Sequence, residues 1–197
     1  SFNEPVEQLV KLSASFIDKN YNFKYNKKNL ISLNNLISDS KSSVIKDIDE
    51  KVLHQIYPLE LLSSSVLVQS LQKYGQNERS LFSFLASNDP YALSSFSEDN
   101  NYFNIVSVYD YINHNFFSYI NSKFNPDFTK WSVIKTIIEK VQGRFSSDIE
   151  DRIKIVKTIG LLNIFASSQI IDDKDFLVKY AKSALSIIWV NHSENSS

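Results

Sequence analysis

Glycine and proline are scarce in this chain, which has three glycines and four prolines among 197 residues. Sandwiches and barrels of β-strands need frequent tight turns, and these two residue types are the main signals of such turns. The sequence therefore predicts an all-α protein, a multi-helix bundle of about nine helices. Pairs of β-branched residues at 44–45, 137–138 and 187–188 leave room for one or two short strands.

Apolar residues recur at three- and four-residue spacing through most of the chain, which is typical of amphipathic helices. Aromatic residues spaced in this way between positions 105 and 120 are interpreted as core packing. The pattern predicts long helices over about 6–20, 30–37, 44–56, 59–74, 77–85, 105–120, 131–143, 149–164 and 176–188, and a short one after Pro90.

Polar and glycine residues mark several of the expected helix ends. Gly75 suits the left-handed position that closes a helix, and Asn77 suits the N-cap of the next one. The acidic group Asp172, Asp173 and Asp175 precedes the last apolar run. Because acids complement the positive end of a helix, we interpret this group as caps rather than as a magnesium site.

The bulk properties exclude several classes of protein. Apolar content of 43% and charged content of 22% are ordinary for a folded domain. A net charge of −1 gives no overall field that would attract nucleic acid or an anionic membrane. The absence of cysteine removes disulfides and thiolate metal sites and favours a reducing compartment, so the expected location is the cytoplasm.

The ends of the chain carry no recognisable targeting signal. Its first residues lack the basic and apolar regions of a signal peptide, and no apolar run is long enough to cross a bilayer. The chain contains no methionine at all. We therefore expect it to be part of a longer, cytoplasmic polypeptide without a membrane partner.

Motifs of the common catalytic classes are missing. None of the three glycines is followed by lysine, so there is no phosphate-binding P-loop and no dinucleotide fingerprint. His54, His114 and His192 lie far apart, and none has a second histidine or acid at a metal-ligand spacing. No serine stands in a Gly-x-Ser-x-Gly elbow. The chain alone is therefore expected to have no catalytic residue, no metal and no cofactor.

Two segments carry a recognisable pattern. The first is YPL at 57–59, an apolar helix, and then YGQNERSLFSFL at 74–85; the second is KIVKTIGLLN at 154–163. Both resemble segments of large bacterial P-loop ATPases related to the AAA+ and STAND groups, several of which are linked to phage defence. The resemblance covers roughly residues 53–165, in a region that follows the nucleotide-binding core of those proteins.

The resemblance implies a role for one arginine. In AAA+ proteins the helical lid after the core often has a glycine, a short polar step and an arginine that opens a lid helix, called sensor 2. Carried to this sequence, Gly75 ends one lid helix and Arg79 begins the next. The positive end of a helix dipole disfavours a cation, and an anionic phosphate of ATP-Mg held by the core would relieve that conflict.

The same resemblance implies a division of the chain. Residues 1–57 would form an N-terminal helical region, residues 58–125 an AAA+-lid-like domain, and residues 126–197 a C-terminal helical region with a truncated, winged-helix-like part. Lys157 and Thr158, within the second motif, are interpreted as residues that bond locally or mark a contact between domains. The chain would thus regulate an ATPase by coupling nucleotide state to domain movement.

Other interpretations stay open at this stage. Arg79 and Glu78 can be ordinary surface residues that form ion pairs. The chain can instead be a helical protein-interaction domain or form a homo-oligomer. DNA binding by the last two predicted helices is disfavoured because their lysines are offset by acids. The residues that would form the interaction surface are aromatic: Tyr102, Tyr109, Tyr111 and Tyr119.

Overall fold

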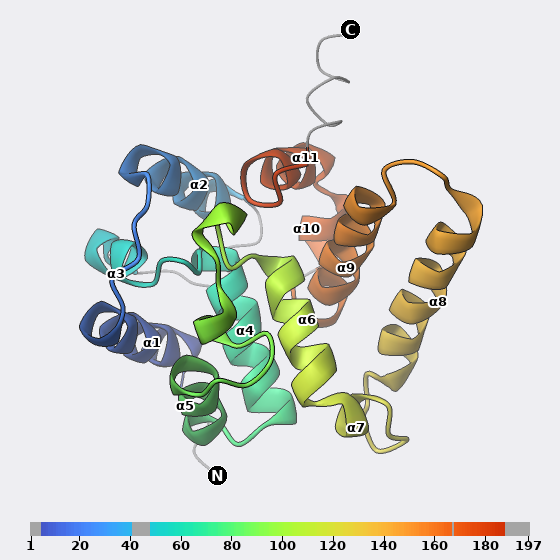
Figure 1. Cartoon of the computed structure of the whole chain (residues 1–197), viewed down its shortest axis with the longest axis horizontal. Helices are drawn as coiled ribbons and strands as arrows, with labels where there is room; N and C mark the ends of the chain where they lie inside the picture. Colours follow the sequence, from blue (N-terminus) through green and yellow to red (C-terminus); the bar gives the residue numbers. More distant parts are fainter. Residues whose placement is uncertain (1–4, 41–47, 167, 188–197) are drawn as a thin grey trace, which may run out of the picture.

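Eleven α-helices and two short 3-10 helices, with no strand, make up the part of the chain that the computed structural model describes, residues 5–40, 48–166 and 168–187 (Figure 1). This confirms the all-α prediction. The elements are α1 (Val6–Asn20), α2 (Lys27–Asp39), α3 (Glu50–Gln55), α4 (Leu61–Tyr74), α5 (Glu78–Ala86), η1 (Leu93–Ser95), η2 (Glu98–Asn100), α6 (Ile105–Asn115), α7 (Phe117–Ile120), α8 (Phe128–Arg144), α9 (Ile149–Phe165), α10 (Ser168–Asp172) and α11 (Lys174–Ser183).

Side-chain caps explain where several helices begin. The side chain of Asn26 accepts from the Asn29 amide at 3.1 Å, and that of Asn104 accepts from the Ser107 amide at 3.1 Å. These bonds satisfy amides that have no partner inside the helix. The predicted cap at Asp173 is confirmed, because its carboxylate accepts from the amide of Phe176 at 3.1 Å.

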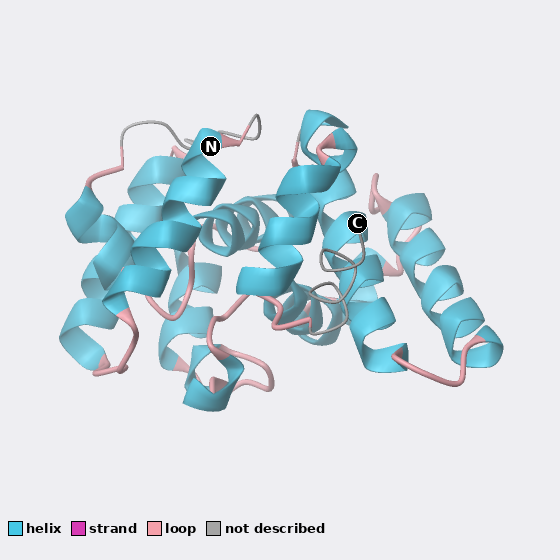
Figure 2. Cartoon of the chain, turned by 90° about the horizontal axis from the view of Figure 1, so that it is seen from above, coloured by secondary structure: helices cyan, strands magenta, loops and turns pink. Residues whose placement is uncertain are grey.

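Helix α4 is the centre of the fold. It contacts α1, α2 and α5 on one side and α6 and α9 on the other (Figure 1). Figure 2 shows the same arrangement of helices from above. Its serines are buried, and the hydroxyls of Ser64 and Ser70 donate to carbonyls of the preceding turn at 3.1 and 2.7 Å. Small residues whose hydroxyls are satisfied within the helix let neighbouring helices approach from every side.

A close contact fixes the packing of α8 against α9. A Cβ atom at Gly160 would lie 2.5 Å from Cγ1 of Ile134 on α8. Such a distance is far below ordinary carbon contacts, so only glycine fits without a shift of the neighbouring helix. Gly160, part of the second motif, is therefore explained by packing.

One hydrophobic cluster extends from Leu9 to Ile187 among the described residues and includes members of all three predicted regions. The side chains of Leu67, Ile112 and Leu161, from α4, α6 and α9, are all fully buried within it. The division at 57/58 and 125/126 stays a prediction, since the cluster by itself does not mark where independent folding units begin.

The structure differs from the predicted elements in several places; η2 and α10, for example, were not predicted. The helix expected over 105–120 breaks at Phe116, where the backbone leaves helical geometry, and gives α6 and α7. The element after Pro90 is a 3-10 helix, and the helix expected over 176–188 ends at Ser183. Residues 137–138 are helical, whereas positions 44–45 and 188 lie outside the described residues. None of the described helices is long and apolar enough to span a bilayer.

Candidate functional site

The first motif forms a tight corner between α4 and α5. The backbone amide of Gln76 donates a hydrogen bond to the hydroxyl of Ser80 at 2.7 Å, and the backbone amide of Arg79 donates one to the backbone carbonyl of Gln76 at 3.1 Å. The amide of Leu81 donates to the carbonyl of Asn77 at 3.0 Å, which starts the regular bonding of α5. Local hydrogen bonds therefore define the position of Arg79 at the opening of the helix.

Gly75 is required for a different reason from the predicted one. Its backbone is extended, with φ of −113°, so the left-handed conformation expected from sequence was wrong. A Cβ atom at Gly75 would lie 2.4 Å from Oγ of Ser80 and 2.9 Å from the carbonyl oxygen of Leu71. The glycine permits this close approach, which no larger residue allows without displacing the first turn of α5.

Asn77 holds the positive φ that Gly75 lacks. It stands at the N-cap of α5 with φ of 45°, a conformation that asparagine adopts more readily than most other residues. Its side chain makes no capping hydrogen bond, although its place at the N-cap was predicted. The start of α5 therefore depends on backbone geometry and on the side chain of Ser80 rather than on the side chain of Asn77.

The side chain of Arg79 is exposed. Its guanidinium makes one long contact, from Nη1 to Oε1 of Gln76 at 3.5 Å. It forms no ion pair with any carboxylate in the described part of the chain, Glu78 included. The ion pair considered from sequence is thus not formed in the described part of the chain, and the only acid beside Arg79 in the first turn of α5 is the exposed Glu78.

An open hollow of about 630 Å³ lies over the outer side of α5. Arg79 is at one end, and Phe82, which is 41% exposed, lies one turn further along the helix. The hollow is a shallow surface with one cation and one aromatic ring, so it suits contact with another macromolecular surface more than enclosure of a small ligand. Its lining residues are Glu78, Arg79, Phe82, Ser83, Ala86 and Ser87.

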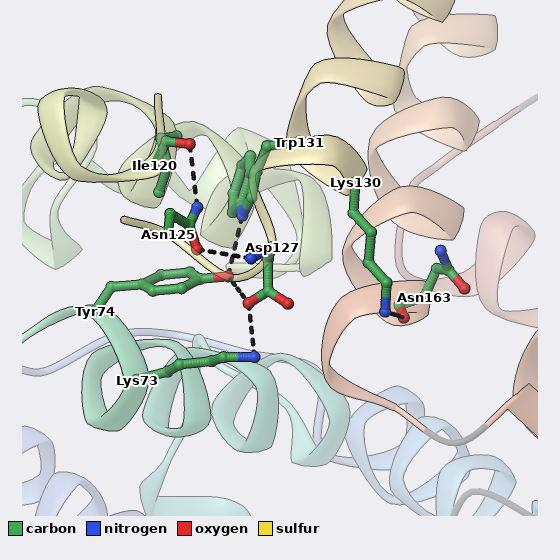
Figure 3. Close-up of polar contacts among 8 residues, drawn as sticks. All are labelled: Lys73, Tyr74, Ile120, Asn125, Asp127, Lys130, Trp131 and Asn163. Atoms are coloured by element: carbon green, nitrogen blue, oxygen red, sulfur yellow. Dashed lines mark hydrogen bonds and ion pairs between the residues drawn. The ribbon is translucent and has the colours of Figure 1, made fainter. Parts of the chain in front are cut away.

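Behind this corner, a buried polar network anchors the end of α4 to the start of α8 (Figure 3). The hydroxyl of Tyr74 donates to Oδ2 of Asp127 at 2.7 Å and accepts from the indole of Trp131 at 3.0 Å. Burial raises the pKa of Tyr74, and the neighbouring Asp127 adds to that increase. The phenol therefore stays neutral and acts as a fixed donor.

Lys73 completes the network with a charge. Its ammonium lies 2.6 Å from Oδ2 of Asp127, a carboxylate whose side chain is only 9% exposed. The loop before α8 is fixed by the side chain of Asn125. This side chain accepts a hydrogen bond from the backbone amide of Asp127 at 2.9 Å and donates one to the carbonyl of Ile120 at 3.0 Å (Figure 3). The last turn of α4 is thus joined to α7 and α8 directly before the Arg79 corner.

The second motif ties α9 to α6. Lys157 lies 2.7 Å from Oδ1 of Asp110, and its ammonium is 5.3 Å from the ring centre of Tyr109. Thr158 donates to the carbonyl of Lys154 at 2.8 Å, so its hydroxyl bonds within the helix as predicted. Lys157 connects residues on either side of the predicted boundary at 125/126, in agreement with a contact between those regions.

A third polar centre lies at the other end of α4. Glu60 is fully buried; it accepts from the amides of Leu62 and Ser63 at 2.6 and 2.9 Å and from the hydroxyl of Tyr180, on α11, at 2.6 Å. The Tyr180 hydroxyl also accepts from the amide of Ile105 at 3.2 Å. Burial raises the pKa of Glu60 to about 7 despite these hydrogen bonds, which favour its charged form. This centre could not be predicted from the sequence, because Glu60 resembles any acid at a helix N-cap.

The remaining candidate residues do not form a site. His54 lies beside Tyr25 and Glu50, His114 packs near Tyr91, and His192 is outside the described residues. In the acidic group, Asp173 caps α11 and Asp175 pairs with Lys179 at 2.9 Å. No cluster of three or more His, Asp or Glu that suits a metal ion occurs in the described ranges.

The aromatic interaction surface considered from sequence was wrong for three of its four residues. Tyr102, Tyr109 and Tyr111 are 6%, 3% and 2% exposed. Tyr109 and Tyr111 belong to α6, which contacts α4 and α9. Tyr119 alone is exposed, at 37%. These rings are core residues, and helical spacing of aromatics does not by itself distinguish core from surface.

Comparisons with known proteins add no assignment. No protein-family model matches the chain, and neither the curated proteins nor the solved structures contain a match.

Proposed function

We propose that this chain is the helical lid and relay of a larger P-loop ATPase, in which Arg79 occupies the sensor-2 position. The nucleotide-binding core, with ATP and Mg²⁺, belongs to a part of the polypeptide outside this sequence. The chain regulates that core and carries no catalytic group of its own. The anti-phage context and the winged-helix-like character of the last helices follow from the resemblance of the two motifs alone.

The observation that carries the proposal is the state of the Arg79 guanidinium. It is exposed, at the positive end of α5, and has only one long contact to Gln76. A cation left in this position costs stability unless an anion meets it. A phosphate oxygen presented by a docked core would supply that anion in the planar, two-pronged geometry that arginine recognises.

The network behind the corner supports the relay. Tyr74 and Lys73 fasten the helix before Arg79 to Asp127, and Lys157 fastens α9 to α6. Because these bonds are buried or partly buried, a displacement at the Arg79 corner would move α4, α6, α8 and α9 together. Rigid-body movement of this kind is a common way of passing nucleotide state to distant domains.

The test is Arg79→Ala in the ATPase that contains this chain. Loss of a charge-assisted contact of about 1.5–3 kcal/mol is expected to reduce ATP turnover by about tenfold or more. Lys11→Ala, an exposed cation on α1, is the matched control and should leave turnover unchanged. If Arg79→Ala turns over ATP at the normal rate, Arg79 is an ordinary surface residue and the proposal fails.

A second measurement concerns the chain alone. Calorimetry with ATP-Mg is expected to show no binding beyond weak, millimolar affinity, because the chain has no P-loop. Tight binding of ATP by this chain in isolation would contradict its assignment as a lid.

A further inference from the structure

Three phenylalanines stand exposed on α7, in the loop that follows it and at the start of α8. Phe117, Phe124 and Phe128 have 56%, 77% and 40% of their surface exposed. They lie within twelve positions of one another, next to the loop held by Asn125 and Asp127. A cluster of exposed aromatic rings is rare on a free protein surface and marks a place where something binds. We name these three side chains, with Lys123 and Lys135, the aromatic face.

Lysine ammonium groups already lie over the rings of this face. The ammonium of Lys135 is 4.8 Å from the ring centre of Phe117 and is held there by a hydrogen bond to Asn121. Lys123 lies 5.4 Å from the ring centre of Phe124. Each ammonium therefore lies beside an aromatic ring. Proteins that bind single-stranded nucleic acids use this combination, in which cations contact the phosphates and aromatic rings stack with the bases.

The charge of this region differs in sign from that of the whole chain. Residues 117–145 contain five basic side chains against two acidic ones, whereas the chain has a net charge of −1. One of the two acids, Asp127, is turned inward and paired with Lys73. Beyond the aromatic face, Lys140 and Arg144 are exposed near the end of α8, where the exposed Glu139 directly precedes Lys140. The occupant that this surface complements is an anion of extended shape.

We propose that the aromatic face binds single-stranded nucleic acid. Bases would stack on Phe117, Phe124 and Phe128, and phosphates would contact the surrounding lysines. Lysine is depleted from protein–protein interfaces, and four of the five basic residues in this region are lysines. An unpaired strand fits better than a duplex, because its bases are free to stack on exposed rings.

The sequence favoured no nucleic-acid partner, but that expectation concerned the net charge and the last two predicted helices. The aromatic face lies elsewhere and depends on exposures that only the fold reveals. The proposal is also independent of the lid function, since it does not involve Arg79. Arg79→Ala is expected to leave nucleic-acid binding unchanged, so the two proposals can fail separately.

The experiment uses the full chain and a fluorescein-labelled oligothymidylate of about fifteen nucleotides, with binding followed by fluorescence anisotropy. Phe124→Ala together with Phe128→Ala is expected to weaken binding by about tenfold or more, because each lost stack removes a base contact. Phe82→Ala with Tyr91→Ala is the matched control, since these rings lie elsewhere in the molecule and are 41% and 50% exposed. That pair should bind like the unchanged protein, and melting curves should confirm that both variants fold.

A salt titration tests the phosphate contacts. For a single strand, the slope of log affinity against log salt is about −0.7 for each phosphate contact. Lys123→Gln with Lys135→Gln should make that slope shallower by about 1.4, whereas Lys27→Gln with Lys28→Gln on α2 should not change it.

Three outcomes would overturn the proposal. The first is absence of measurable binding to the oligothymidylate at low salt. The second is equal weakening by the Phe82 and Tyr91 pair. The third is binding of a polyglutamate peptide of matched charge as tightly as the oligonucleotide, which would assign the face to an acidic protein partner.

Discussion

The buried carboxylates at the two ends of helix α4 have different kinds of partner. At the N-terminal end, Glu60 is fully buried and has hydrogen bonds but no cation among its described partners. At the C-terminal end, Asp127 accepts a hydrogen bond from the hydroxyl of Tyr74 and forms an ion pair with the ammonium of Lys73. The first end can lose its charge and stay folded, whereas the second is built around a charge and leads to the exposed Arg79.

This difference in partners indicates a different role for each end of α4. Glu60 joins α4 to α6 and α11 through Tyr180, wholly inside the protein, so its role is to hold the fold. The Asp127 network is partly open to solvent through Lys73 and stands directly before the Arg79 corner. A polar centre next to an exposed, unpaired arginine is the better candidate for passing a signal.

The largest effect on stability is expected from Asp127→Ala. It leaves the Tyr74 hydroxyl without its acceptor and Lys73 without its partner, which should lower the free energy of unfolding by about 3 kcal/mol. Urea denaturation measures this change. Asp175→Ala removes an exposed ion pair with Lys179 and should cost less than about 1 kcal/mol. Equal losses in the two variants would show that the buried Asp127 network contributes no more to stability than an exposed ion pair.

Stability should next depend on pH through Glu60. Its pKa is raised from 4.5 to about 7 in the folded protein, so the folded state retains a proton that the unfolded chain releases. The contribution of Glu60 is therefore complete below about pH 4.5 and is lost as pH rises through about 7, by roughly 2–3 kcal/mol. Urea denaturation across this range measures the fall.

Glu60→Gln provides the control for that titration. It removes the titrating group, so this part of the pH dependence should disappear even though one hydrogen bond is lost. A variant that keeps the full dependence between pH 4.5 and 7 would show that another group is responsible.

A smaller effect is expected from Tyr180→Phe. The hydroxyl bridges Glu60 and the amide of Ile105, so its removal leaves two buried groups short of a partner and should cost about 1–2 kcal/mol. Tyr119→Phe, at an exposed phenol, is the control and should change the melting temperature very little. A neutral result at Tyr180 would mean that α11 is held by apolar packing alone.

The smallest effect on stability is expected from Arg79→Ala. The side chain is exposed and makes one long hydrogen bond, so the free energy of unfolding should change by less than about 0.5 kcal/mol. Removal of a cation from the positive end of α5 can even raise it slightly. A loss of several kcal/mol would make Arg79 a structural residue and remove the basis for its assignment to a ligand.

The sequence by itself determined the helical class and most helix positions. Periodic apolar residues need a core on one side, and this requirement is local enough to be read from spacing. The ends of α1, α4 and α9 agree with the prediction within a few residues, and Asn77 and Asp173 stand at helix starts as expected. The sequence also placed Arg79 at the opening of a helix.

Tertiary structure alone decided which residues face solvent and which polar groups meet. Tyr109 and Phe117 are both aromatic residues of the helix predicted over 105–120, yet the first is 3% exposed and the second 56%. Glu60 and Tyr180 are 120 positions apart, and their hydrogen bond depends on how four helices pack. Burial and long-range pairing depend on contacts between distant segments, and the spacing of residues along the chain does not contain them.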